Sequence, residues 1–192
     1  MRSAEVHVTT PAGTNLVFRI GDRPVTKQNG DASLANMQGA RNLIDREVEL
    51  PAGAIRVAPL EETVEGTIAF PDGLWNGQKA AGIVLSFKKG KVTSIAARAG
   101  QEHVKAELDR AGVAGYSFRE MAVGFNPLLA IAGDKPFIPY YGYGAGIVRL
   151  SLGDNAELGG NVKGPYVRWN FFTDATVEVG TQTWIRDGVR VK

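Results

Sequence analysis

The 192-residue sequence contains no cysteine and only two histidines, His7 and His103. The absence of cysteine excludes disulfides, thiolate metal sites and a cysteine nucleophile. No serine stands in a Gly-x-Ser-x-Gly context with a positioned histidine, so a serine hydrolase has no support. The scarcity of imidazole groups therefore limits the available chemistry more strongly than the charge of the chain does.

The sequence also lacks a strong charge of one sign and a long hydrophobic run. Its 22 basic and 20 acidic residues are interspersed, so no basic stripe indicates a nucleic-acid partner. No apolar run reaches the roughly 18 residues that indicate a membrane helix, and no signal-peptide pattern begins the chain. We therefore expect a cytoplasmic protein without nucleic-acid or membrane partners, folded as one domain over residues 1–192.

The sequence is rich in glycine, with 24 residues, and in short runs of valine, isoleucine and threonine. Such runs between turn residues are typical of short β-strands. The predicted strands and hairpins are Glu5–Thr10 with Asn15–Ile20, Ala54–Ala58, Val64–Phe70, Gly82–Phe87 with Lys91–Ala97, and Trp184–Val191 turning at Asp187-Gly188.

Helical patterns are few. In Gln101–Gly112, apolar residues recur at helical spacing with charges on the other face, which predicts an amphipathic helix. Glu120–Ile131 is a second helix candidate that an internal glycine and proline oppose, and Gly21–Glu47 is predicted to be a polar loop with at most one short helix. The predicted fold class is α+β: a mixed or antiparallel β-rich domain with few helices.

Two further strand-like segments each carry an arginine within an apolar run. In Gly146–Gly153, alternation places Arg149 on the face opposite the apolar side chains. In Tyr166–Asp174, Arg168 lies on the face opposite Trp169. A charge in a core strand is costly unless it is paired or faces a wet cleft, so these arginines are candidate functional residues.

Several segments, taken in order, resemble the C-terminal part of the aminopeptidase T/S family. They are PAGTNL at Pro11–Leu16, GAIRVAP at Gly53–Pro59, EMAVGFNP at Glu120–Pro127, and the two arginine-bearing segments. The resemblance implies the family fold, a leucyl aminopeptidase-like exopeptidase activity that uses two metal ions, and a homodimer. A family member carries a further domain before this region, which we expect to be absent here, and a companion chain that supplies it is an open possibility.

The positions that would hold metal ligands in the family are mostly replaced. The family glutamate after Pro-x-Gly is Ala54 here, whereas the glutamate of the next motif is kept as Glu120. The histidine of the Gly-Thr-Ile-His motif is Arg149, and a tyrosine expected shortly afterwards falls at Ala156. Arginine cannot ligate a cation, so these changes remove metal-binding capacity.

The last family motif, His-x-Asp, is also changed. Its histidine is Arg168 and its aspartate is Asn170, while the following aspartate remains as Asp174. A catalytic metal pair needs several carboxylate or imidazole ligands. We therefore expect no metal or other cofactor, and neither metallo-aminopeptidase activity nor the iron dioxygenase chemistry that this fold also hosts.

The replacements suggest a pocket for a small anionic or zwitterionic molecule. Two arginines facing one glutamate keep the site positive, and guanidinium groups bind carboxylates in a bidentate manner. Glu120 would accept a bond from the amine of a ligand, or act as a general base if its pKa is raised. The predicted ligand-binding residues are Arg149, Arg168, Tyr166, Asn170 and Asp174.

Two alternatives stay open. The same charges form a structural ion-pair cluster if they are buried without access to solvent, in which case the chain is an inactive structural or regulatory module that acts through self-association. A metal-dependent aminopeptidase-like hydrolase is the third possibility, and it requires ligands that the sequence does not provide.

Overall fold

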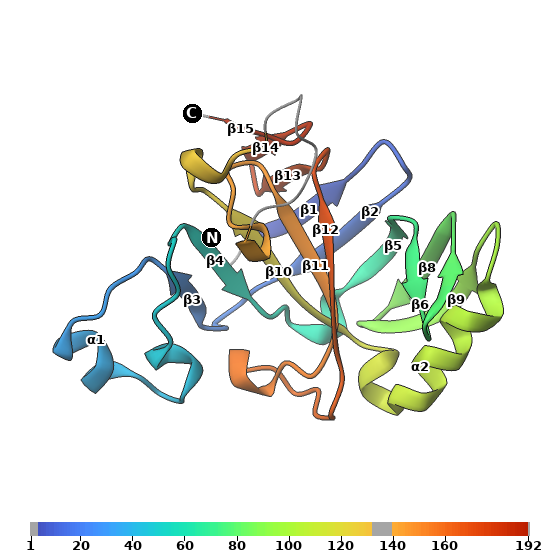
Figure 1. The fold of residues 1–192 in the computed structure, drawn as a ribbon, viewed down its shortest axis with the longest axis horizontal. Helices are drawn as coiled ribbons and strands as arrows, with labels where there is room; N and C mark the ends of the chain where they lie inside the picture. The colour runs from blue at the N-terminus through green and yellow to red at the C-terminus, as the bar shows by residue number, and fades with distance from the viewer. Residues whose placement is uncertain (1–3, 132–139, 192) are drawn as a thin grey trace.

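The computed structural model describes residues 4–131 and 140–191, and within them the chain is mainly antiparallel β-structure (Figure 1). The strands are β1 (Glu5–Thr9), β2 (Asn15–Arg19), β3 (Val25–Gln28), β4 (Ala54–Val57), β5 (Glu65–Phe70), β6 (Gly73–Trp75), β7 (Gln78–Ala80), β8 (Ile83–Lys88), β9 (Lys91–Ala96), β10 (Phe118–Gly124), β11 (Val148–Gly153), β12 (Val167–Phe172), β13 (Thr176–Val179), β14 (Gln182–Arg186) and β15 (Val189–Arg190). The helices are α1 (Leu34–Gly39) and α2 (Gln101–Gly115), with 3-10 turns η1 (Ile44–Arg46), η2 (Glu61–Thr63), η3 (Pro127–Leu129), η4 (Tyr140–Gly142) and η5 (Ala156–Leu158). None of the helices in these ranges has the length and hydropathy that a membrane crossing requires.

The strands form two large sheets and one small hairpin. Sheet A has eight strands in the order β15-β14-β13-β1-β2-β5-β8-β9, and sheet B has five in the order β12-β11-β10-β4-β3. The hairpin pairs β6 with β7. Figure 1 shows α1 at one end of the molecule, beyond β3, and α2 at the other end, beside β6 and β9. The predicted β-rich fold with few helices is confirmed.

The hydrophobic core lies between the two sheets. Sheet A contributes residues such as Phe18 and Ile68, and sheet B contributes Met121 and Leu150, all fully buried. The rings of Phe18 and Phe118 meet across the sheets, with their centroids 5.7 Å apart. Because the core takes one face of sheet B, its other side chains alternate onto an outer face.

The hairpin predictions agree with the structure. β1 pairs with β2, β8 with β9, and β14 with β15, all antiparallel. Asp187 and Gly188 have φ angles of 49° and 75°, the left-handed conformation of a tight hairpin turn. The helix predicted over Gln101–Gly112 is α2, whose helical geometry breaks at Gly112, where φ is 61°.

Two predictions about secondary structure fail. The helix candidate Glu120–Ile131 is wrong, because its first half belongs to β10, the central strand of sheet B, and its second half contains only the turn η3. Gly21–Glu47 contains the strand β3 as well as α1. In both cases pairing with β4 overrides the local sequence preference.

Candidate functional site

The outer face of sheet B carries a buried polar network around Ala122. In the strand register, Ala122 of β10 stands between Arg149 of β11 and Arg56 of β4. The small side chain leaves room for both guanidinium groups. Glu120 lies two residues along β10 on the same face, where its carboxylate lies between the two guanidinium groups.

Glu120 is fully buried and is bound on both oxygens. Arg56 Nε donates to Glu120 Oε2 at 3.0 Å, and Arg149 Nη2 donates to Glu120 Oε1 at 3.1 Å. The Ser151 hydroxyl donates to the same Oε1 at 3.4 Å. Burial by itself raises the pKa of the Glu120 carboxyl, but the positive charges of Arg149, Arg56 and Arg119 outweigh burial and hold that pKa below its ordinary value.

Arg149 is enclosed by the protein. Only 2% of the residue is exposed, and its Nη1 donates to the Tyr141 carbonyl at 3.3 Å. Its guanidinium lies over the Trp169 ring, 4.7 Å from the centroid, which is a cation–π contact. Burial lowers the pKa of Arg149, and the attraction of Glu120 opposes that effect. Its Nε is buried without a hydrogen-bond partner.

A β-bulge adds a third arginine. Phe118 pairs with Leu152 and Glu120 pairs with Ser151, so Arg119 is the extra residue on β10. Neighbouring residues at a bulge share a side of the sheet that alternation would separate. Arg119 Nε therefore lies 3.6 Å from the Glu120 carboxylate.

A second carboxylate completes the network. Glu157, on the turn η5, accepts a hydrogen bond from Nη2 of Arg119. It also accepts one from Nη2 of Arg56, at 3.4 Å. Unlike Glu120, its side chain is 41% exposed. We call Arg56, Arg119, Glu120, Arg149 and Glu157 the Glu120 network.

Arg168 does not belong to this network, which corrects the prediction that it lines a pocket together with Arg149. Arg149 pairs with Phe171 on the outer face, whereas Arg168 pairs with Leu152, whose side chain is in the core. The two arginines therefore lie on opposite faces of sheet B. The alternation within each segment was predicted correctly, but on β12 the arginine faces inward and Val167 and Trp169 are 45% and 40% exposed.

Arg168 instead anchors a second cluster between β12, α2 and β6. Its Nη1 donates to Glu107 of α2 at 2.9 Å, and its Nη2 donates to the Leu74 carbonyl at 3.1 Å. Its guanidinium lies 3.5 Å from the ring centroid of the buried Trp75. The Tyr166 hydroxyl also donates to Glu107, at 2.7 Å. We call Trp75, Glu107, Tyr166 and Arg168 the Glu107 cluster.

The remaining predicted residues lie near Arg168 or in solvent. The Asn170 side-chain oxygen accepts from Arg168 Nε at 3.3 Å, so Asn170 belongs with Arg168 rather than with Arg149. Burial raises the pKa of the Tyr166 hydroxyl, and its bond to Glu107 adds to that effect. Asp174 is exposed beyond the end of β12. The sequence-predicted residues thus divide into two groups: Glu120 and Arg149 lie in the Glu120 network, and Tyr166, Arg168 and Asn170 lie together near Glu107. Asp174 belongs to neither group.

The donor atoms at the Glu120 network do not fit a divalent cation. Its single buried carboxylate is surrounded by three guanidinium groups, which repel a cation and cannot ligate one. Across residues 4–131 and 140–191, no three His, Cys, Asp or Glu side chains gather as a metal site. His7 contacts Asn15 and Glu178 at the first hairpin, and His103 lies beside Glu102 on α2.

Sequence reasoning missed Arg56, Arg119 and Glu157. Arg56 was detectable, because it stands between Ile55 and Val57 in a predicted strand, which is the signal that identified Arg149. Arg119 depends on the bulge and Glu157 on a turn distant in sequence from β4, and neither contact has a local signature.

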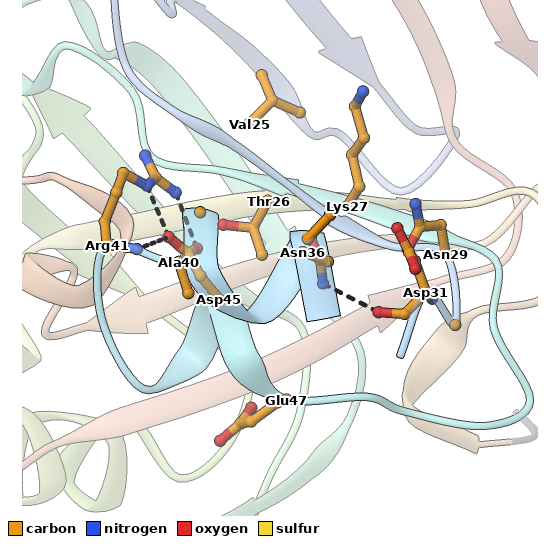
Figure 2. Close-up of a pocket in the computed structure, with 13 residues that line it drawn as sticks. Val25, Thr26, Lys27, Asn29, Asp31, Asn36, Ala40, Arg41, Asp45 and Glu47 are labelled. Carbon is orange, nitrogen blue, oxygen red and sulfur yellow. Dashed lines mark hydrogen bonds and ion pairs between the residues drawn. The ribbon is translucent and has the colours of Figure 1, made fainter. Parts of the chain in front are cut away.

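Figure 2 shows a polar cavity between β3 and the α1–η1 segment. Its volume is about 420 Å³, and Thr26, which lines it, pairs with Arg56 in the strand register. Arg41 and Asp45 close one side through a bidentate pair with bonds of 2.6 and 2.8 Å. Glu120 and Arg149 do not line this cavity.

The fold and the network together define a β-rich, two-sheet domain that carries a buried arginine–glutamate network on the outer face of sheet B. Residues 1–125 match the family described as thermophilic metalloprotease (M29), and the chain belongs to this family. The resemblance to aminopeptidases T and S is thereby confirmed.

Two solved structures share the fold. The 2,5-dihydroxypyridine dioxygenase from Pseudomonas putida KT2440 superposes with a TM-score of 0.73 at 18% identity, over 99% of this chain and 56% of that one. Wild-type AmpT from Thermus thermophilus gives a TM-score of 0.64 at 19% identity, over 98% of this chain and 50% of that one. The chain therefore spans about half the length of each. No curated protein matches the sequence significantly.

Proposed function

We propose that this chain is a metal-free member of the M29 family that binds a small carboxylated or otherwise anionic molecule at the Glu120 network. The observation that supports this function is the charge of the network, in which three arginines face one fully buried glutamate. Guanidinium groups held in this way select planar oxyanions such as carboxylates. Glu157, whose side chain is 41% exposed, is the member of the network that reaches solvent.

The role proposed for Glu120 is to hold the arginines in place. A general base needs a raised pKa, and here the arginines lower the pKa of Glu120. A fully buried, doubly bonded carboxylate is therefore suited to positioning Arg56 and Arg149 rather than to accepting a proton.

The second candidate function is that of an inactive structural or regulatory module that works through self-association. The pairing of Glu120 with buried arginines favours it, because such networks also occur as purely structural elements. Large apolar side chains exposed along the α1–η1 segment and beyond are consistent with it, since Leu34, Leu43 and Leu50 are 67%, 79% and 68% exposed. A metal-dependent hydrolase is disfavoured by the donor set.

Titration calorimetry with succinate, inorganic phosphate and glycine tests the proposed function. We expect the wild type to bind one of these probes, and Arg119→Gln to weaken binding by about tenfold or more, because it loses a charge-assisted bond of roughly 1.5–3 kcal/mol. Arg168→Gln is the matched control: it also loses one guanidinium, but on the opposite face of sheet B.

Prior treatment with EDTA, followed by dialysis that removes it, should leave this binding unchanged, and the purified protein should contain no stoichiometric zinc, cobalt or iron. Equal binding by wild type and Arg119→Gln, or binding that stays lost after metal has been stripped and the EDTA removed, would contradict the proposal.

A further inference from the structure

Glu157 occupies the solvent side of the Glu120 network in the manner of a bound ligand. Arg56 and Arg119 each contact the buried Glu120 on one side and the exposed Glu157 on the other. Both contacts of Glu157 are made by its Oε1. Thus one carboxylate oxygen bridges the guanidinium groups of two arginine residues that are only 4% and 3% exposed.

The backbone around Glu157 is fixed independently of its carboxylate. Asn155, two residues earlier, donates to Glu61 at 3.0 Å, and the Asn161 amide donates to the same carboxylate at 2.7 Å. Asn42 donates to the Glu157 carbonyl at 2.9 Å. The Glu157 side chain can therefore rotate away from the arginines without movement of the turn that carries it.

Arg56 and Arg119 can still attract an anion when the Glu157 side chain rotates away from them. Glu120 then faces Arg56, Arg119 and Arg149 alone, so the network carries an excess of positive charge. Arg119 then keeps only its 3.6 Å contact with the Glu120 carboxylate, and a buried guanidinium that loses one of its partners is costly. A solvent oxyanion that replaces Glu157 removes that cost.

We propose that Arg56 and Arg119 form an oxyanion seat that Glu157 occupies as an internal competitor, and that a small carboxylate or phosphate takes the place of the Glu157 carboxylate. This inference rests on the proposed function, because it identifies where on the Glu120 network the anion binds. It makes Glu157 a residue that sets affinity: the seat is available only in the fraction of molecules whose Glu157 side chain has rotated out.

The test is calorimetry on Glu157→Gln with succinate and, separately, with inorganic phosphate, which distinguishes a carboxylate from a phosphate seat. The neutral amide competes weakly for two guanidinium groups, so we expect binding of the preferred anion to be about tenfold tighter than in the wild type, as for a seat that is open about a tenth of the time. Glu62→Gln is the matched control, because it removes one negative charge from an exposed position, and its affinity should equal that of the wild type.

Each outcome has a distinct meaning. Tighter binding in Glu157→Gln alone supports the seat and its internal competitor. If the wild type and Glu157→Gln bind equally and Arg119→Gln weakens both, the competitor role is overturned while the proposed function stands. If neither protein binds either anion, the proposed function fails as well. Equal tightening in Glu62→Gln would show a general effect of net charge and would overturn the inference.

Discussion

At the scale of single residues, Glu120 is the centre of the network, because its one buried carboxylate contacts all three guanidinium groups. Bringing these charges out of water is expensive, and their mutual attraction repays that cost only while both signs are present. Removing one charged residue of the network should therefore lower the stability of the fold more than replacing all of its charged residues by apolar ones.

Glu120→Ala should lower the free energy of unfolding by about 3–5 kcal/mol, as expected when one partner of a buried ion pair is removed. Urea denaturation followed by circular dichroism measures this. The comparison variant is Glu120→Ala combined with Arg149→Met, which also removes the guanidinium that Glu120 neutralises. We expect the double variant to be more stable than Glu120→Ala alone, and the reverse order would contradict our account of the network.

At the scale of secondary-structure elements, β12 joins two clusters that do not share a face. Trp169 contacts Arg149 on the outer side, while Arg168 contacts Glu107 of α2 on the inner side. The Glu107 cluster also includes the backbone carbonyl of Leu74 in β6. Arg168 thus fastens α2 and the β6–β7 hairpin to the edge strand of sheet B.

Arg168→Met should loosen this attachment without affecting anion binding. The variant loses one charge-assisted bond to Glu107, worth about 2 kcal/mol, and the cation–π contact with Trp75. Hydrogen exchange should therefore quicken in α2 and in the β6–β7 hairpin while β10 and β4 keep their protection. Faster exchange confined to β10 and β11 would indicate that Arg168 belongs to the outer face after all.

The sequence predicts elements whose contacts are close together along the chain better than elements whose contacts are distant. Hairpins such as β8–β9 are local, and their turn residues identify them. The strand that carries Arg149 was predictable from alternation, and so was the pairing of Arg149 with Glu120 through the family motifs. Which face of β12 meets the core depends on its register with β11, and the sequence does not encode that register locally.

At the scale of the whole molecule, three buried or half-buried glutamates make stability depend on acid. In Glu120, Glu61 and Glu107, burial raises the pKa, but charge and hydrogen-bond partners outweigh it and hold the pKa below the ordinary 4.5. Protons therefore bind the unfolded chain more readily than the folded one in this range. Their contribution is complete above about pH 4.5 and is lost as the pH falls through their lowered folded-state pKa values.

We expect the urea concentration at the midpoint of unfolding to decrease once the pH drops below 4.5, which is the ordinary pKa of these groups. Glu49 opposes the trend, since burial raises its pKa, but it is one group against three. Glu107→Gln should be less stable than the wild type at pH 7 and should lose less on acidification. Midpoints that stay constant from pH 7 to pH 3 would contradict this prediction.

Because of the bulge in β10, Arg119 is an extra residue inserted into the strand. Phe118 and Met121 both face the core although they are three positions apart, because Arg119 is the residue without a partner on β11. Deleting Arg119 would leave an uninterrupted ladder with Phe118 and Met121 still inward and Glu120 still outward. Deleting Arg119 would therefore remove one guanidinium from the oxyanion seat while every other residue of β10 stays on its present face. The deletion would change the charge of the seat and leave the strand register as it is.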